Sequence, residues 1–411
     1  MRVLLISHSF PLPALDGGRI AFLNTLKSLA RTHEVGVVCL VGGNEDTSIQ
    51  DLERLCKFVK VFKRSRHQDP LRILAGMVLE PPGAGFKYWY SGAGELIRRT
   101  IRAWKPEIVE FHHLHTAVYQ RFCTGVPTIL REHNVEHKVW ERHAQHVLSW
   151  PARAHAKWST PRVRRYEAAM ACRFDRCVVV SNADAEYLRG VSPRVRVDIV
   201  PFGVDPDYFS PFSESEEKPF RMALTGSFEW RPKQHNLRIL LAEIMPRVSA
   251  IVPEAELYVV GAGVPADLLK LAERTPGVTV TGRVPDVRPF VATASLVLNY
   301  VESGGGIAMK VLEAMAMQKP VLSNSLGCEG IEVEHGRDVF LADGVEAFAQ
   351  AAGYLLTDPC RRRGLAMNGR KRAEEGYSWT AIAGQMDRCY ESVLKEYSER
   401  ATGTLSGCPA T

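Results

Sequence analysis

The sequence has no long apolar run and few signs of export or redox chemistry. No run in its 411 residues reaches the roughly 18 apolar residues that span a bilayer. The N-terminal apolar run, Val3–Ile6, is short and is followed by polar residues, so we expect no signal peptide. The nine cysteines include no C-x-x-C pair, which favours reduced thiols. These absences argue against a membrane-spanning or disulfide-stabilised protein and predict a cytoplasmic location.

Two common active-site motifs are also missing. No G-x-G-x-x-G follows the first apolar run, which argues against a dehydrogenase. His133 and His137 have the i, i+4 spacing of a metal-binding pair, but the segment is not H-E-x-x-H and no third ligand is marked. These motifs therefore indicate neither a dehydrogenase cofactor nor a metal, and the histidine pair is the alternative left open.

The composition is that of a soluble globular protein, with 45% apolar and 24% charged residues. The net charge of +6 is unevenly distributed. Residues 1–200 carry 30 Lys and Arg against 19 Asp and Glu, whereas the rest carries 22 against 27. A basic first half favours an anionic partner, either nucleic acid or a membrane surface, unless it is only a solvated face.

Short apolar runs alternate with helical patterns along the whole chain. Most of the apolar runs are continuous, as in parallel strands that are covered on both faces. The alternation predicts an α/β fold of doubly wound parallel sheets that bind ligands at the carboxyl ends of their strands. The predicted strands are 2–7, 35–41, 107–111, 127–131, 176–180, 197–200, 221–225, 256–260, 277–280, 295–299 and 320–323. The predicted helices are 18–31, 48–56, 92–104, 161–173, 183–189, 234–249, 266–273, 306–318 and 345–356.

A proline-rich and charged stretch after residue 200 predicts a domain boundary. We expect an N-terminal Rossmann-like domain over 1–200, a linker over 201–218 and a second domain over 219–375. A helix is predicted over 376–400. The small and polar residues 401–411 predict a disordered tail.

Three consecutive glycines, Gly304–Gly306, precede a helical pattern that contains Lys310 and Glu313. Glycines allow backbone N–H groups to line a loop at the start of a helix, which is a favourable place for an anion. Such a loop suits a sugar nucleotide, with amides and Lys310 at the diphosphate and Glu313 at the ribose hydroxyls. An ordinary loop of an α/β protein is the alternative.

Several motifs in a fixed order resemble those of the GT-B glycosyltransferases, specifically the family-4 group of retaining enzymes. The resemblance covers about residues 1–395. It is carried by Asp16-Gly17-Gly18, Arg131–Glu136, Val200–Asp205 with Phe209 and Pro211, Leu257–Gly263, Thr281–Val284, and Glu313–Ala316 with Pro320-Val321. Arg131–Glu136 is similar to the subset that acts in bacterial surface polysaccharide assembly. The resemblance implies a central cleft between the two domains and a last helix that crosses back to the N-terminal domain.

The resemblance also implies a function and a set of site residues. It implies transfer of a sugar, with retention, from a nucleoside-diphosphate sugar (a UDP-sugar is expected) to a saccharide or lipid-linked saccharide. His133 and Glu313 are the expected catalytic residues, and His112, Glu132 and Asn134 the expected acceptor-binding residues. No metal is implied. The expected donor-binding residues are Gly17, Gly18, Arg231, Lys233, Gly282, Arg283, Val284, Gly305, Gly306, Ile307, Ala308, Lys310 and Glu313.

At two positions the sequence departs from the family pattern. Ser227 stands where the family has a phosphate-binding arginine, and Gly305 stands where it has the first glutamate of an E-x7-E motif. Arg231 and Glu302 are candidates to replace these two groups. A sugar-nucleotide epimerase of the same architecture and a non-catalytic binding protein are therefore the alternative functions. The base, the sugar, the acceptor and the oligomeric state are not fixed by the sequence.

Two segments that mix aromatic and basic residues favour a peripheral position on an anionic membrane. One is 150–165 and the other is 57–66. Basic segments packed inside the domain are the alternative. The order of the motifs argues against nucleic acid as a partner.

Overall fold

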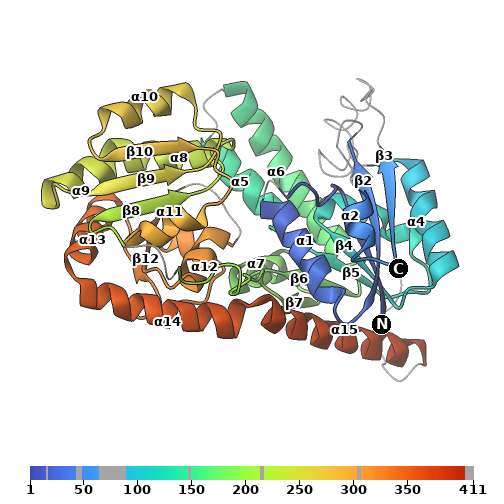
Figure 1. The fold of residues 1–411 in the computed structure, drawn as a ribbon. Helices are drawn as coiled ribbons and strands as arrows, with labels where there is room; N and C mark the ends of the chain where they lie inside the picture. Colours follow the sequence, from blue (N-terminus) through green and yellow to red (C-terminus); the bar gives the residue numbers. More distant parts are fainter. Residues whose placement is uncertain are drawn as a thin grey trace. The chain divides into compact units, whose positions relative to one another are not determined.

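A computed structural model describes residues 1–14, 17–42, 49–63, 89–146, 150–212, 217–302 and 307–402 (Figure 1). The chain divides into two compact units. Unit 1 is Met1–Pro201 together with Ile382–Thr411, and unit 2 is Phe202–Ala381. Gly305, Gly306, Asp16, Arg64 and Arg66 lie outside the described residues, as do most of the predicted tail and part of the predicted linker.

The described part of unit 1 contains a seven-stranded parallel sheet with the order β3-β2-β1-β4-β5-β6-β7. Its central strands are apolar on both faces; in β1, for example, the side chains of Val3, Leu4, Leu5 and Ile6 are fully buried. The strands are β1 Arg2–Ser7, β2 Glu34–Val41, β3 Phe58–Lys63, β4 Ile108–His112, β5 Thr128–Arg131, β6 Arg176–Val179 and β7 Val197–Ile199.

Helices cover both faces of this sheet. One face packs against residues of α4, η2, α6 and α7 in a single apolar cluster. The helices are α1 Gly17–Leu29, α2 Ile49–Glu53, α4 Ser91–Trp104, η2 Leu114–Phe122, α5 Glu136–His146, α6 Trp150–Ala171, α7 Asn182–Val191 and α15 Trp379–Ala401.

The described part of unit 2 contains a six-stranded parallel sheet with the order β10-β9-β8-β11-β12-β13. Two apolar clusters lie on it. The first includes residues of α8, η3, α9, α10 and α13, and the second includes residues of α11, α12 and α14. The strands are β8 Arg221–Thr225, β9 Glu256–Val260, β10 Val278–Gly282, β11 Leu296–Asn299, β12 Val321–Ser323 and β13 Phe340–Leu341.

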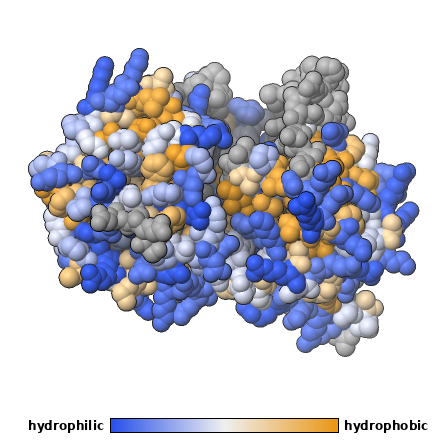
Figure 2. Space-filling view, in the orientation of Figure 1, coloured by the Kyte–Doolittle hydropathy of each residue, from blue (hydrophilic) through white to orange (hydrophobic). Residues whose placement is uncertain are grey.

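The helices of unit 2 are α8 Arg231–Ile239, η3 Leu240–Ile244, α9 Met245–Ile251, α10 Ala266–Arg274, α11 Arg288–Thr293, α12 Met309–Ala316, η4 Leu326–Cys328, α13 Val345–Thr357 and α14 Pro359–Tyr377. The single helix predicted over 234–249 is divided by η3, a π-helical turn. Pro246 follows that turn and has no N–H to donate, so the hydrogen-bond ladder must change register there. Hydrophilic side chains predominate on the face drawn in Figure 2.

The predicted fold class, with two Rossmann-like parallel sheets, is confirmed. The elements that were not predicted are β3, β13, α5, α11, α14 and the short η2 and η4. The omission of β3 matters because its residues belong to the segment interpreted as membrane-binding. Phe58 and Phe62 instead pack against the core of unit 1, and Lys60 Nζ donates a hydrogen bond to Thr100 Oγ1 at 3.1 Å. The segment is an edge strand, where lysines are common.

The last helix, α15, contributes to unit 1 from Ile382 onward. Glu396 accepts hydrogen bonds from Arg176 Nη2, at 2.5 Å, and Arg196 Nη1, at 2.7 Å, and Arg400 Nη2 donates to Asp175 Oδ1 at 2.8 Å. These ion pairs join the helix to Arg176 of β6, to Asp175, which precedes β6, and to Arg196, which precedes β7.

Candidate functional site

Each sheet contains one point at which the strand order reverses. In unit 2, β8 lies between β9 and β11; in unit 1, β1 lies between β2 and β4. The crossover connections leave such a point on opposite sides, which opens a crevice at the carboxyl ends of the two strands. The residues that follow β8 and β11, and those that follow β1 and β4, are therefore the first candidates for a site.

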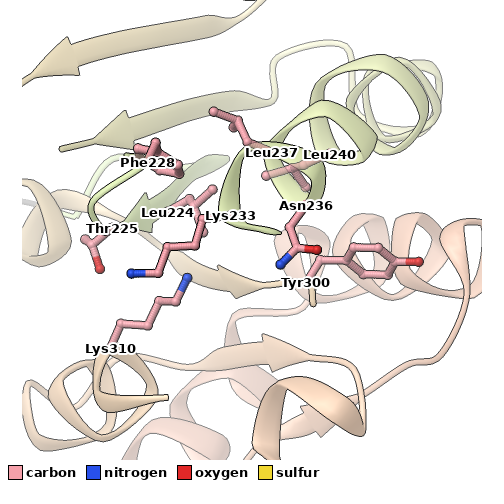
Figure 3. A pocket seen from close by; sticks show the side chains of 10 residues that line it. Leu224, Thr225, Phe228, Lys233, Asn236, Leu237, Leu240, Tyr300 and Lys310 are labelled. Atoms are coloured by element: carbon pink, nitrogen blue, oxygen red, sulfur yellow. The ribbon is translucent and has the colours of Figure 1, made fainter. Parts of the chain in front are cut away.

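A pocket lies at this point of unit 2. In Figure 3 the side chains of Lys233, from α8, and Lys310, from α12, extend toward one another. Two ammonium groups in one pocket give a strong preference for an anion with more than one negative charge. The residues that line the pocket are Leu224, Thr225, Gly226, Phe228, Lys233, Asn236, Leu237, Leu240, Tyr300 and Lys310.

Burial and neighbouring charges shift the pKa values of Lys310 and Glu313. Burial, and secondly the charge of Lys233, lowers the pKa of Lys310 to about 8, although Glu313 opposes the shift. Burial raises the pKa of Glu313 to about 7, and Lys310 opposes that shift. An anion beside Lys310 would offset the repulsion between the two lysines and so raise the pKa of Lys310.

The start of α12 adds to the anion preference. Lys310 is the second residue of this helix and Glu313 lies one turn further on. Ala308, which precedes the helix, makes no side-chain cap hydrogen bond. The amides of Met309 and Val311 already donate to the carbonyl oxygens of Ile307 and Ala308, so the start of the helix favours an anion through the positive end of its dipole. Ile307 and Ala308 are half-buried, and the helix begins at Met309, three residues later than predicted.

A close approach between two loops shapes the same edge of the sheet. Gly261 follows β9 with φ 144°, and a Cβ added there would lie 1.7 Å from the carbonyl oxygen of Gly226, which follows β8. Any larger residue would have to displace the backbone. Glycine at this position therefore keeps the carboxyl ends of β8 and β9 close together beside the pocket.

The remaining predicted donor residues lie outside the pocket lining. Arg231 is the first residue of α8 and is exposed, so the second positive charge in the pocket belongs to Lys310. Gly282 ends β10 with φ 71°, Arg283 is exposed with Nη2 3.9 Å from Glu229 Oε1, and Val284 is half-buried. Their contact with a donor stays a prediction.

Glu302, the candidate replacement for the missing glutamate, lies beside the pocket. Its Oε1 accepts a hydrogen bond of 2.8 Å from Oη of Tyr300, which lines the pocket. Its Oε2 lies 3.7 Å from Nε2 of His235. The glutamate is thus held by Tyr300, which directly follows β11, and by His235 of α8, and it is still partly exposed, with 42% of its side-chain surface accessible.

In unit 1 the structure brings together two of the predicted residues. His112 ends β4 and His133 follows β5, the neighbouring strand. Nδ1 of His112 lies 3.0 Å from Nε2 of His133. Their exposures are 0% and 3%, so His112 lies in the interior behind His133. Burial is the main reason that the pKa of both histidines is below its ordinary value.

Three buried residues that the sequence reasoning missed support this pair. Glu110 Oε1 lies 3.1 Å from Nε2 of His112 and 3.9 Å from Nη1 of Arg131, and Glu110 Oε2 accepts a 2.5 Å hydrogen bond from Tyr390 Oη. Burial raises the pKa of Glu110, but His112, Arg131 and Tyr390 together keep it below its ordinary value. The alternation Glu110-x-His112 on a strand was a possible signal; Tyr390, 280 residues away, had none.

This arrangement determines which nitrogens carry the protons. A carboxylate beside Nε2 of His112 favours the tautomer that is protonated there, so the lone pair lies on Nδ1. Nε2 of His133 then donates to that lone pair. The neutral His133 ring is left with its acceptor lone pair on Nδ1.

The two other predicted acceptor residues differ in exposure. Glu132 is 1% exposed, and Asn134 is half-buried. Burial and the charges of Glu167, Glu136 and Asp184 raise the pKa of Glu132 well above its ordinary value, which favours its protonated form. Gly17 and Gly18 are the first two residues of α1, and a Cβ on Gly17 would meet no atom within 4 Å.

Comparisons with known families agree with this architecture. Residues 15–208 match the family model described as Glycosyltransferase Family 4, and residues 219–358 match the one described as Glycosyl transferases group 1. MMP alpha-(1->4)-mannosyltransferase of Mycolicibacterium hassiacum is 26% identical over 255 residues, which are 58% of this chain and 60% of that protein. A GDP-mannose-dependent mannosyltransferase of Corynebacterium glutamicum, which acts on a monoacylated phosphatidylinositol monomannoside, is 26% identical over 218 residues.

The second relative is matched over 47% of this chain and 55% of its own length, so these alignments span somewhat more than half of each curated relative. Among solved structures, sucrose-phosphate synthase of Thermosynechococcus elongatus has a TM-score of 0.71 at 18% identity and covers 96% of this chain and 100% of its own. HepE of Anabaena, in complex with UDP and glucose, has a TM-score of 0.68 at 16% identity, with 95% and 100% coverage. These structures share the fold of this protein.

Proposed function

The chain belongs to the family-4-like GT-B glycosyltransferases, and from this premise we propose that it transfers a sugar, with retention, from a nucleoside-diphosphate sugar to a saccharide or lipid-linked saccharide. The observation that carries the proposal is the pocket of unit 2. Lys233 and Lys310 face each other at the switch point of a parallel sheet, beside the uncapped start of α12.

The chemistry of transfer requires this kind of charge. The bond between the sugar's anomeric carbon and the diphosphate breaks, while the acceptor oxygen bonds to that carbon on the same face. The acceptor's hydroxyl proton leaves to a diphosphate oxygen. Negative charge therefore grows on the leaving diphosphate, and cations and amides directed at it stabilise the transition state. A charge-assisted hydrogen bond contributes roughly 1.5–3 kcal/mol, so two lysines supply several orders of magnitude in rate. Transfer then needs no resident metal.

The other residues of the proposed site take roles from their chemistry. Glu313, half-buried behind Lys310, accepts hydrogen bonds from the ribose hydroxyls. Glu302 holds the sugar in place of the glutamate that the family has at position 305. In unit 1, His133 bonds a hydroxyl of the sugar or the acceptor, and Asn134, which is half-buried, contacts the acceptor. His112 and Glu132, the other expected acceptor residues, are buried, and His112 supports His133 from the interior.

A UDP-sugar is the proposed donor. HepE, which shares the fold, is described with UDP and glucose, whereas the Corynebacterium relative depends on GDP-mannose. The α products named for both mannosyltransferases support retention, since sugar nucleotides of this type carry α-linked sugars. Surface polysaccharide assembly is the proposed setting, as Arg131–Glu136 suggests.

Nucleotide binding is the first test. Thermal unfolding is followed with UDP, GDP and ADP, and then with the sugar nucleotides of the base that binds, all in the presence of EDTA. A ligand at about 100 times its Kd adds roughly 2.7 kcal/mol of stability. UDP is expected to give the largest shift. A larger shift with GDP would overturn the choice of base, and no shift with any nucleotide would overturn the donor site.

Turnover separates the proposed reaction from its alternatives. A transferase hydrolyses its donor slowly without acceptor and consumes it faster when a saccharide acceptor is supplied. An epimerase would instead interconvert donor sugars with no acceptor present. Binding without either reaction would identify a non-catalytic protein.

We also propose a peripheral position at the inner face of the cell membrane. The surface of α6 carries Trp150 and Trp158, which are 80% and 48% exposed, and basic side chains near an anionic surface add about 1 kcal/mol each. Among the described residues, no helix combines the length and apolarity of a membrane span. The exposed basic residues of α6 are Arg153, Lys157, Arg164 and Arg165.

Vesicle sedimentation tests this position. The protein should pellet with phosphatidylserine vesicles and not with phosphatidylcholine vesicles. The double variant Lys157→Glu/Arg164→Glu should stay in the supernatant, whereas Lys270→Glu/Lys371→Glu, on the exposed surface of unit 2, should pellet like the wild type. Equal pelleting of all three proteins would contradict the proposal.

A further inference from the structure

Three histidines at the switch point of unit 1 are not used by the proposed reaction. His8 follows β1, His113 follows β4, and His115 lies in η2. Because β1 and β4 pair in parallel, with Ile6 opposite Phe111, their carboxyl ends place these residues side by side. One nitrogen of each ring lies within 4.8 Å of those of the other two. Within the described ranges, this is the only group of three His, Cys, Asp or Glu residues with such spacing.

We propose that His8, His113 and His115 form a binding site for a divalent transition metal, with Zn²⁺ as the expected ion. Imidazole nitrogen suits Zn²⁺, Ni²⁺ and Cu²⁺, whereas Mg²⁺ and Ca²⁺ prefer oxygen. Three histidines with one open position form one of the known zinc arrangements. The site differs from the His133–His137 pair that the sequence suggested, since Nδ1 of His137 contacts Glu167.

The geometry requires only a small adjustment. Nitrogens bound at 2.0–2.1 Å to one tetrahedral ion are about 3.4 Å apart. The ring centroids are 4.6 Å apart for His8 and His113, 5.1 Å for His8 and His115, and 6.2 Å for His113 and His115. Ring movements of about 1 Å bring the nitrogens to bonding distance. All three side chains are half-buried, so an ion from solvent can reach them.

Two further observations favour a ligand here. His113 has φ 67° and ψ 148°, an uncommon conformation for a residue with a side chain, and such strain is concentrated at ligand sites. Glu136 Oε1 lies 3.7 Å from Nε2 of His115. A carboxylate behind a metal-binding histidine orients the ring and offsets the charge of the ion.

The position of the site predicts an effect on its surroundings. The ring of His113 packs against that of His133, with centroids 3.8 Å apart. An ion that draws His113 toward His8 and His115 changes this contact. If the proposed transfer is correct, added Zn²⁺ should lower its rate and EDTA should restore it. This last point rests on the proposed function; the binding site itself does not.

Metal binding is tested directly on the full chain. The protein is stripped with EDTA, dialysed, and titrated with Zn²⁺ against a chromophoric chelator. We expect one tight site per chain. Loss of a neighbour of a ligand typically costs 10- to 100-fold in affinity, so His8→Ala and His115→Ala, which each remove a ligand, should weaken binding by at least about 100-fold. His155→Ala, an exposed histidine on α6, is the matched control and should bind like the wild type.

Co²⁺ provides a second measurement that needs no variant. Wild-type protein loaded with Co²⁺ should show the visible absorption of a tetrahedral site, and equimolar Zn²⁺ should remove it. The proposal is wrong if the wild type lacks this absorption, or if the His8→Ala, His115→Ala and His155→Ala variants bind Zn²⁺ equally. UDP binding to the same samples keeps this result separate from the donor site.

Discussion

The two switch points of the molecule share a topology and differ in chemistry. In unit 2 the carboxyl ends of β8 and β11 are accompanied by two lysines and closely packed glycines. In unit 1 the ends of β1 and β4 are accompanied by imidazoles and buried carboxyl groups. The first edge attracts a polyanion, and the second accepts hydrogen bonds and attracts transition metals. The same sheet architecture therefore carries two complementary kinds of site, and each prediction below tests this division.

Removal of both lysines from the pocket of unit 2 should have the largest effect. Lys233→Ala/Lys310→Ala removes two charge-assisted interactions of roughly 1.5–3 kcal/mol each, so the Kd for UDP should rise about 10²- to 10⁴-fold. Titration calorimetry measures it. Lys270→Ala, an exposed lysine on α10, should leave the Kd unchanged. Equal affinity in the two proteins would contradict the role of the pocket.

Residues at the carboxyl edge of the unit 1 sheet should affect the rate of transfer strongly and the affinity for the nucleotide little. His133→Ala removes a group of the kind that contributes roughly 10²- to 10⁴-fold in acid–base catalysis; for a hydrogen-bonding role we expect a fall in kcat of about 10²-fold. The Kd for UDP should change less than about threefold. A large change in the Kd with an unchanged kcat would reverse the division between the two edges.

Glycine should be required at position 261, where the loops after β8 and β9 of unit 2 approach each other, and not at position 17, where α1 of unit 1 begins. Gly261→Ala places a Cβ 1.7 Å from the Gly226 carbonyl oxygen, and such overpacking typically costs about 1–3 kcal/mol. Gly17→Ala meets no atom within 4 Å, so its free energy of unfolding should change by less than about 0.5 kcal/mol. Urea unfolding of both variants decides the matter. Similar losses of unfolding free energy in both variants would contradict this difference between the two sheet edges.

The pH dependence of UDP binding should report Lys310. Its pKa is lowered to about 8, and it faces Lys233 and Glu313. An anion favours the protonated lysine, so the affinity should fall as the pH rises through that value, by about tenfold at pH 9. Lys310→Arg, which stays charged, should remove the decline. A decline that persists in Lys310→Arg would assign it to another group.

Chelation should have the smallest effect. If lysines and amides stabilise the leaving diphosphate, protein stripped of metal should transfer sugar at the same rate with and without added Mg²⁺. A rate that rises more than about twofold with Mg²⁺ would show that the pocket of unit 2 needs an ion as well as its lysines.

Elements with strong local patterns were predicted well from the sequence. The runs 2–7, 221–225 and 256–260 coincide with β1, β8 and β9 because buried parallel strands are continuously apolar. The residues 58–63 were interpreted as part of a membrane-binding segment because aromatic and basic residues are mixed there, whereas the structure shows an edge strand with two partly buried phenylalanines. The π turn at Leu240–Ile244 had no local signal other than the following proline.

The candidate site in unit 2 also shows how far local sequence patterns could predict the structure. Lys310 and Glu313 were identified because they follow a glycine-rich loop at the start of a predicted helix, and Lys233 because of its place in the family pattern. The structure brings the two lysines into one pocket. Arg231, the candidate replacement for the missing arginine, is exposed and lies outside the pocket lining; linear spacing says nothing about which side chains face each other. The role of Lys310 as the second cation depends on the packing of α12 against β11 and β12.

What the sequence by itself determined is the fold class and the type of chemistry at each end of the chain. Apolar periodicity requires two parallel sheets, and such sheets present their carboxyl edges to ligands. Only the tertiary structure decided which side chains meet there. Tyr390 meets Glu110 across 280 residues, and His8 meets His113 because β1 and β4 are neighbours. Contacts of this kind arise from strand order and helix packing, which depend on the whole chain and leave no signal in any short segment.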